Sequence, residues 1–424
     1  MIPFVAMVLF GCLALGALVV DLGLVVLTQG QMQTVADAAA IEGLRLRDAS
    51  DLNGQPIGDV GRRQAAVQMA ALVFDDDLDP LATLTQPLLQ LGAGPNLTLS
   101  DGITDLNASQ LISFPDQRTY QPVLELNVAN QVHGDLVAGT FTPPVPAAPP
   151  IEGNAYVRND FTPSDQAGSA VASAFLVRLR RTNDFDGLDN QGGISSSGTA
   201  LPLLLGHGSM TPLEHPLNPY GYNFRQHGFT VRATAVADAR PALRVGLPQP
   251  ATATLPPLAG ATPFALDQVF WAALSEGTPV AATVDAAGTV SSGAVAVAGR
   301  FTPPPPIPPA LPDPAVLTTV GQMVVPAAPV LAAPVTGYVP IYQIVTEGGL
   351  PVERVIGFGH VSVTGAVPAL QMTKLPTVIA PGNASRHLGQ IPALPDPTVW
   401  PQIVAANTAS LAAAGTVLTP ALVR

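Results

Sequence analysis

Residues 17–44 read ALVVDLGLVVLTQGQMQTVADAAAIEGL, an apolar run with one acid, Asp21, that continues into an alanine-rich polar segment. From residue 2 to residue 28, Asp21 is the one charged side chain. An α-helix rises about 1.5 Å per residue, so this run is about 40 Å long, and a bilayer core needs about 20 apolar residues. The length of the run therefore permits a membrane-spanning helix.

A cleavable signal peptide does not fit this segment. Such peptides begin with basic residues and have a short apolar region, whereas here no Lys or Arg precedes the apolar run and the run is longer. A membrane anchor with no basic flank before Arg45 is also unusual. Both features are explained if a basic leader ahead of Met1 has been removed. We therefore expect a retained helix, and whether Met1 is a processed or an encoded terminus stays open.

Beyond residue 28 the segment becomes amphipathic. Apolar side chains recur near one face at helical spacing, while polar side chains lie elsewhere; the apolar set is Met32, Val35, Ala36, Ala39 and Ala40. Alanine-rich surfaces let helices approach closely. We expect one continuous helix over about the first 45 residues, ended by the sequence DLNGQPIG at 51–58.

These residues resemble a known family. The apolar helix with VDLG at 20–23, followed by ADAAAIEG at 36–43, is similar to the TadE/TadG-like proteins of tight-adherence (Flp) pilus systems. Two later stretches, 177–209 and 228–243, resemble segments of the larger TadG-like members. The resemblance implies a type IV pilin-like N-terminal helix. Position 5 is Val5 where type IV pilins have glutamate, so the contact of that glutamate is not transferred.

Asp21 needs a specific environment within this helix. A buried, unpaired carboxylate is costly, so it must reach the headgroup region, find a partner in a helical bundle or be protonated. One hypothesis is that Asp21 marks the aqueous end of the span. The other is that it pairs with a neighbouring subunit and sets the register between subunits. We predict an assembly surface that includes Leu15, Val19, Asp21, Met32 and Val35.

The remaining chain is predicted to be mostly β-structure. A second short helix is expected over 62–74, and a third over 262–274 with Thr262 as its cap. Alternation of apolar and polar residues predicts strands over 119–130, 174–182 and 228–239, and a hairpin over 338–363 that turns at 347–351.

The overall expectation is an α+β fold: a long hydrophobic helix followed by β-rich, sandwich-like domains with proline-rich connections. We expect a pilin-like helix over 1–50, a first β-rich domain over 51–245 and a second over 246–424. The proline-rich stretches 138–150 and 298–314 share an AG-x-FTPP pattern and favour extended linkers or surface straps, with partner docking as an alternative.

The charge balance limits the partners. Charged residues make up 11% of the chain, the net charge is −12 and Lys374 is the one lysine, so we expect no nucleic-acid partner. Cys12 is the one cysteine, which excludes an intrachain disulfide.

No residue pattern points to catalysis. The six histidines lack HExxH spacing, and GHGSM at 206–210 does not satisfy the G-x-S-x-G pattern, so we expect no enzymatic activity. Oxygen-rich loops at 75–80 and 183–190 make calcium possible, although solvated turns are the simpler interpretation; the candidate ligands are Asp75, Asp77, Asp184, Asp186 and Asp189. No other cofactor is expected.

Two functions remain. The chain is expected to be a structural subunit of an extracellular pilin-like filament, which reaches the cell surface from the inner membrane and packs against identical subunits through its helix. The alternative is a membrane-anchored minor pilin or accessory protein of a Tad pilus assembly system. Both imply the assembly machinery as a partner and the membrane as the location before assembly.

Overall fold

The structure is a computed structural model. It describes residues 2–51, 53–74, 124–132, 134–142, 160–164, 172–181, 201, 229–245, 264–284, 289–292, 295–301, 318–321, 323, 335–366, 368–380, 384–385, 401–403 and 415–423. The chain forms two compact units. The first consists of Met1–Arg47, Ile57–Asp238 and Leu422–Arg424, and the second of Asp48–Pro56 and Ala239–Ala421. The expected division used three consecutive segments, whereas these units are interleaved along the chain.

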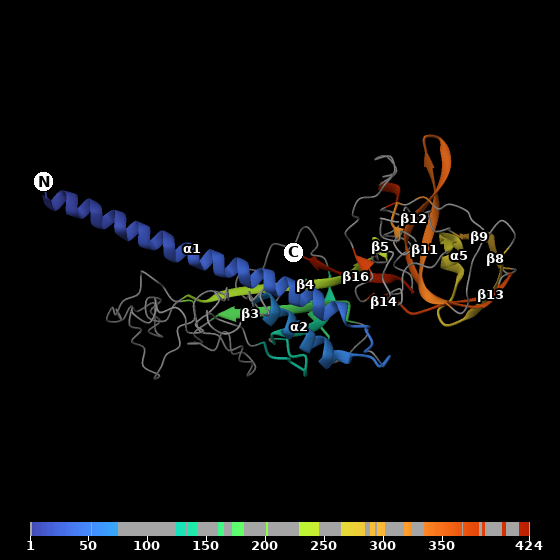
Figure 1. The fold of residues 1–424 in the computed structure, drawn as a ribbon, viewed down its shortest axis with the longest axis horizontal. Helices are drawn as coiled ribbons and strands as arrows, with labels where there is room; N and C mark the ends of the chain where they lie inside the picture. Colours follow the sequence, from blue (N-terminus) through green and yellow to red (C-terminus); the bar gives the residue numbers. More distant parts are fainter. Residues whose placement is uncertain are drawn as a thin grey trace, which may run out of the picture. The chain divides into compact units, whose positions relative to one another are not determined.

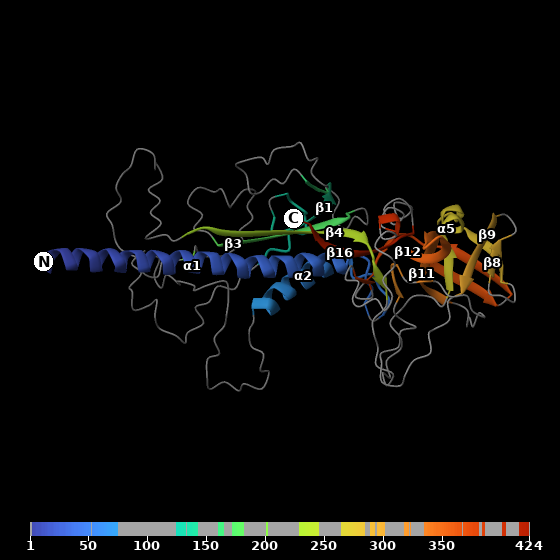
Figure 2. The same ribbon diagram turned by 90° about the horizontal axis from the view of Figure 1, so that it is seen from above.

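Two helices open the chain. α1 (Ile2–Arg45) is continuous, as the sequence predicts, and α2 (Gly58–Phe74) follows it (Figure 1). The C-terminal half of α1 packs on α2 and on strand β3, and Figure 2 shows β3 and β4 beside that half. Small residues make this close approach possible; the fully buried ones in the helix pair are Ala36, Ala39, Ala40 and Ala66.

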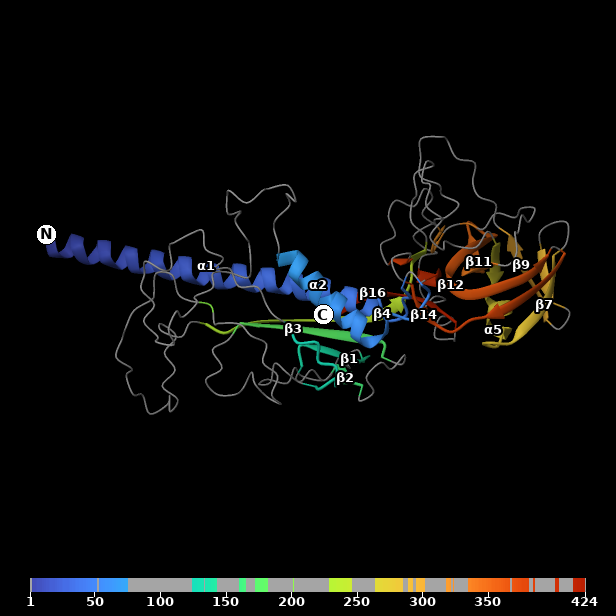
Figure 3. The ribbon, with the colours of Figure 1, turned by 60° about the horizontal axis from the view of Figure 1, so that its bottom comes forward.

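The first unit contains an antiparallel sheet. Its strands are β1 (Leu136–Phe141), β2 (Phe161–Pro163), β3 (Ala174–Arg181) and β4 (Val231–Pro241). Within this unit the strand order is β4-β3-β1-β2. Figure 3 shows β1 and β2 beside β3. Every residue of β3 is buried, which makes it the central strand of this unit.

The second unit is built on a closed seven-stranded barrel in the order β11-β12-β13-β7-β8-β9-β6. Its strands are β6 (Phe264–Asp267), β7 (Pro279–Val284), β8 (Thr289–Ser292), β9 (Val295–Phe301), β11 (Val335–Glu347), β12 (Leu350–Ala366) and β13 (Ala369–Lys374). Neighbouring strands are antiparallel except β6 and β11, which are parallel. We expected sandwich-like packing, and this unit has a barrel instead.

A short helix fills part of the barrel core. α5 (Gln268–Ala273) begins after Asp267, whose side chain accepts a hydrogen bond from the Val269 N–H. Trp271 of α5 is buried against Gly359 of β12, where a Cβ atom would lie 2.8 Å from Cζ3 of the indole. Outside the barrel, β5 (Arg244–Val245) pairs with both β10 (Thr318–Thr319) and β15 (Ala384–Ser385). The short strand β14 (Val378–Ile379) pairs in parallel with β16 (Val417–Val423).

Most of the predicted elements are confirmed, one is wrong in its described part, and the third helix is shorter than expected. The helix over 62–74, the strands over 174–182 and 228–239 and the hairpin all appear, and the hairpin turns at Gly348 and Gly349, both with positive φ. The described part of 119–130 is a loop, because Asn127 and Asn130 adopt positive φ. Within 262–274, β6 comes before the helix, and Asp267 is the cap. Thr262 and most of both proline-rich stretches lie outside the described residues.

Candidate membrane and assembly surface

The N-terminal half of α1 is an exposed apolar surface. From residue 3 to residue 20 the helix is exposed, except for Gly11 and Ala17, which are half-buried. Leu15 is 64% exposed and Val19 is 69% exposed. By length and composition, Pro3–Arg45 is the one helix in the described part of the chain that could cross a bilayer. Side chains of this kind need lipid or protein around them.

The C-terminal half of α1 is part of the core of the first unit. Met32 and Val35, which the sequence placed on the assembly surface, are buried within this unit. Gln33 connects the helix to the sheet, because its Nε2 donates to Asp37 Oδ1 (2.8 Å) and to the carbonyl oxygen of Thr234 in β4 (3.1 Å). An assembly role for Met32 and Val35 stays a prediction.

One aromatic contact fixes the end of α1. Phe175 of β3 lies against Gly43, where a Cβ atom would be 2.6 Å from Cδ1 of the ring. The guanidinium carbons of Arg62 and Arg63 lie 5.4 Å and 5.8 Å from the centroid of the same ring. Arginine over an aromatic face is a favourable cation–π arrangement. Phe175 therefore joins both helices to the sheet.

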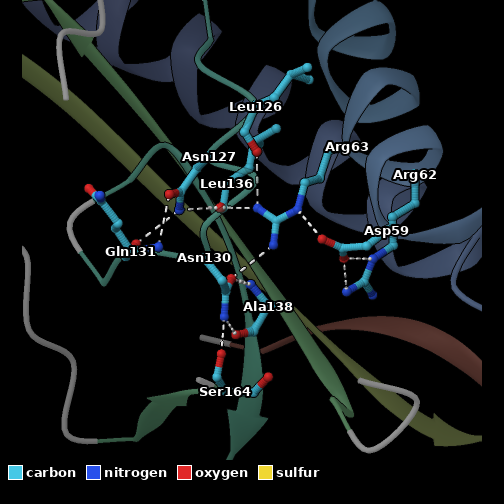
Figure 4. A network of polar contacts seen from close by, with 10 residues as sticks. All are labelled: Asp59, Arg62, Arg63, Leu126, Asn127, Asn130, Gln131, Leu136, Ala138 and Ser164. Atoms are coloured by element: carbon cyan, nitrogen blue, oxygen red, sulfur yellow. Dashed lines mark hydrogen bonds and ion pairs between the residues drawn. The ribbon is translucent and has the colours of Figure 1, made fainter. Parts of the chain in front are cut away.

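The same two arginines belong to a buried polar network (Figure 4). Arg63 Nε donates to Asp59 Oδ2 (2.7 Å), and Arg62 Nε donates to Asp59 Oδ1 (2.7 Å). Arg63 also donates to the carbonyl oxygens of Leu126 (3.1 Å) and Leu136 (2.5 Å). Arg63 thus connects α2 to the loop before β1 and to β1 itself.

Asn130 completes the network by extending the pairing of β1. Its Oδ1 accepts from the Ala138 N–H (2.7 Å) and from Arg63 Nη2 (2.9 Å). Its Nδ2 donates to the carbonyl oxygens of Ala138 and Ser164. Asn residues tolerate the left-handed conformation that this loop requires. The side-chain oxygen thus provides the buried Ala138 N–H with a hydrogen-bond acceptor.

A charged cluster lies near the start of β1. Asp135 is fully buried, with Oδ1 3.6 Å from Arg180 Nη2, and its Oδ2 accepts from the Glu125 N–H (3.1 Å). Arg178 Nη1 donates to the carbonyl oxygens of Val132 and Gly134 (2.8 Å each). Burial raises the pKa of Asp135 to about 6, although the Glu125 N–H and the arginines act in the opposite direction.

The sequence reasoning missed both the network and the charged cluster. One signal was present: Asp59 precedes Arg62 and Arg63 by three and four residues, the spacing at which side chains on a helix meet. Two partners of Arg63, Leu126 and Asn130, come from a loop that the sequence assigned to a strand, and Leu136 belongs to β1. No local pattern indicates those long-range contacts.

The candidate calcium ligands cannot be placed, because Asp75, Asp77, Asp184, Asp186 and Asp189 lie outside the described residues. Among the residues that the structure describes, no group of three or more His, Cys, Asp or Glu side chains could hold a metal ion. Calcium therefore stays a prediction, as does the absence of other cofactors.

Comparison with known families concerns the N-terminal helix. Residues 1–49 match the family model described as "Putative Flp pilus-assembly TadE/G-like". The chain carries a TadE/G-like N-terminal segment. The match covers α1 and the residues just after it, and so includes both the exposed apolar half and the packed half. The comparison with curated proteins found no match, and neither did the comparison with solved structures.

This TadE/G-like segment associates the chain with Tad-type pilus systems, and its apolar helix is consistent with a membrane-anchored, pilus-related location.

Proposed function

We propose that the chain is a structural subunit of a pilin-like extracellular filament. In this proposal, the exposed half of α1 packs against the same segment of neighbouring copies, and the strand-rich units lie outside this helical core. The observation that carries the proposal is the division of α1 into a half buried in its own unit and a half that is exposed and apolar.

The energetics favour covering this surface. Leaving a large apolar side chain in water rather than burying it costs about 1.5–3 kcal/mol. The exposed large apolar residues of α1 are Phe4, Val5, Met7, Val8, Leu9, Phe10, Leu13, Leu15, Leu18, Val19, Val20, Leu22, Val26 and Leu27. Such a surface is stable in a membrane before assembly and among identical helices afterwards.

Transfer from lipid to a helical bundle depends on close packing. Lipid tails are as apolar as leucine, so helices in a membrane associate through van der Waals contact where small residues let the backbones approach. The exposed half supplies such residues at Gly11, Ala14, Gly16 and Ala17. Repeated head-to-tail contacts that do not close produce an open helical polymer.

The proposal includes a location and partners. The subunit would reside in the inner membrane with the pilus assembly machinery and then move to the cell surface within the filament. Its role would be structural and cell-adhesive, without catalysis or an obligatory cofactor. The TadE/G-like match over residues 1–49 supports this assignment.

The second candidate is a membrane-anchored minor pilin or accessory protein of the same system. It is favoured by the length of α1, which is sufficient for a membrane anchor without any filament. Copy number separates the two functions. Electron microscopy and quantitative mass spectrometry of sheared surface material would show a regular fibre made largely of this chain, or a fibre that contains only traces of it.

A substitution tests the helix-core arrangement. Leu15→Arg or Val19→Arg places a charge on the exposed apolar surface and should abolish fibre formation while both units remain folded. Val269→Arg is the matched control, because Val269 is exposed and apolar in the second unit. Wild-type amounts of fibre from Leu15→Arg and Val19→Arg would contradict the proposed arrangement.

A further inference from the structure

Asp21 lies on the inward face of α1. Five buried residues recur along this helix at spacings of seven, four, three and four: Asp21, Thr28, Met32, Val35 and Ala39. Residues at these spacings form a single stripe along an α-helix. The stripe is apolar or small from Met32 onward and polar at its N-terminal end. Asp21 is therefore the first residue of the face that the chain covers.

The burial of Asp21 contrasts with that of its neighbours. Asp21 is 4% exposed, whereas Val20 and Leu22 are about half exposed and Val19 is 69% exposed. Asp21 also takes part in an interaction within the chain. It is thus directed toward its own unit, away from the surface offered to lipid or to other copies.

The exposed segment ahead of Asp21 matches a bilayer in length. Residues 3–20 extend about 27 Å along the helix, and a hydrocarbon core is about 30 Å thick. The residues after Asp21 do not themselves limit insertion, since 22–27 read LGLVVL and the next acid is Asp37. The apolar character of α1 alone would allow the membrane boundary to move several residues toward its C-terminus.

We propose that Asp21 is a positioning residue that fixes how far α1 enters the membrane, so that the inserted segment ends at Val20. Asp21 is covered by the chain and takes part in an interaction within it, and moving its carboxylate into hydrocarbon is costly. This proposal rests on the membrane-embedded stage of the proposed function. It assigns Asp21 a role within one copy of the chain, in place of a pairing between copies.

The test measures thiol accessibility in lipid vesicles that contain the full chain. Cys12, the natural cysteine, is replaced by Ser, and single cysteines are introduced as Val19→Cys and Val26→Cys, both at positions 69% exposed in the chain. A membrane-impermeant maleimide should label position 26 and leave position 19 unlabelled when Asp21 is present. In Asp21→Leu, labelling at position 26 should fall about tenfold, because lipid now covers residues 22–27.

Two further variants separate positioning from folding. Asp21→Glu keeps the charge and should restore labelling at position 26. Thr28→Val removes another buried polar group of the stripe, whose hydroxyl has no hydrogen-bond partner among the described residues, and should leave labelling unchanged. A loss of structure alone would increase labelling at position 26, opposite to the expected change.

The outcomes are distinct. Equal labelling at position 26 in the Asp21 and Asp21→Leu chains would overturn the positioning role, and so would increased labelling in Asp21→Leu. If Asp21 acted only between subunits, vesicles with widely spaced single copies would show that equality. Labelling at position 19 in every variant would contradict the membrane stage, and with it both the proposed function and this proposal.

Discussion

Gly43 of α1 lies against the ring of Phe175 in β3, and the absence of a side chain at position 43 is what brings the helix so close to the sheet. Gly43→Ala should destabilise the first unit by about 1–3 kcal/mol, because the added methyl group overpacks the contact. Chemical denaturation in detergent would measure this change. Gly30→Ala is the control: position 30 has open space, so the better helix propensity of Ala should leave stability equal or higher.

Arg63 should contribute more to the stability of the first unit than an ordinary helical ion pair does. Arg63→Met removes a buried ion pair and three hydrogen bonds to the loop and β1, and should cost about 3 kcal/mol or more. Arg45→Met is the matched control, since Arg45 makes the same kind of local pair with Glu42 at a half-exposed site and should cost less than about 1 kcal/mol. Equal losses in the two variants would contradict the role of the network.

Asp135 should make the first unit less stable as the pH rises. Its pKa is about 6 in the folded chain and about 4 when unfolded, so between these values the folded state binds more protons. The contribution of Asp135 to stability is highest below pH 4, falls between pH 4 and pH 6 and levels off above that, by an amount on the order of 2–3 kcal/mol. Unfolding of wild type and Asp135→Asn from pH 4 to pH 8 measures the difference.

The comparison with the variant is needed because another group acts in the opposite direction. Burial alone would raise the pKa of Asp59, but its ion pairs with Arg62 and Arg63 lower it. The stabilisation from the ion pairs of Asp59 is present at neutral pH and is lost as the pH falls. A difference between wild type and Asp135→Asn that stays constant with pH would contradict the assignment to Asp135.

The rate at which Lys374 is acetylated should measure how often the barrel opens. The side chain of Lys374 is buried, with 3% of the residue exposed. Its Nζ lies 4.4 Å from the centroid of the Trp271 ring and donates a hydrogen bond to the Trp271 carbonyl oxygen (3.3 Å). Burial lowers the pKa of its amine, with Glu276 acting in the opposite direction, so resistance to an amine reagent reflects access rather than charge. Acetylation of Lys374 should be roughly a hundredfold slower than in unfolded chain.

An introduced lysine provides the control for that experiment. Gln371→Lys lies on the same strand at an exposed position and should be acetylated rapidly in the folded chain. Mass spectrometry of the two sites distinguishes them in one sample. Rapid acetylation at both sites under native conditions would show that the barrel opens freely.

The helices were the most predictable part of this fold. α1 could be predicted from a local property, a long apolar run that continues into an alanine-rich face, and its packed residues followed from helical spacing. β3 and β4 followed from the alternation of apolar and polar residues. Each of these signals is contained within one segment, so a single sequence is sufficient to detect it.

The remaining features depend on contacts between distant segments. Closure of the barrel requires β6 to pair with both β9 and β11, and no local pattern encodes such pairing. The alternation around residue 126 favoured a strand, but the positive φ of Asn127 and Asn130 and their hydrogen bonds stabilise a loop. The sequence predicted the packed face from Met32 onward, but its extension through Thr28 to Asp21 appears only in the structure.

The interleaving of the two units has a consequence for resistance to proteases. The chain passes between the units after residues 47, 56, 238 and 421. A cut anywhere between residues 57 and 421 therefore produces two fragments that each contribute segments to both units. Such fragments should stay together on a native gel and separate only under denaturing conditions, so a nicked subunit would persist as one particle.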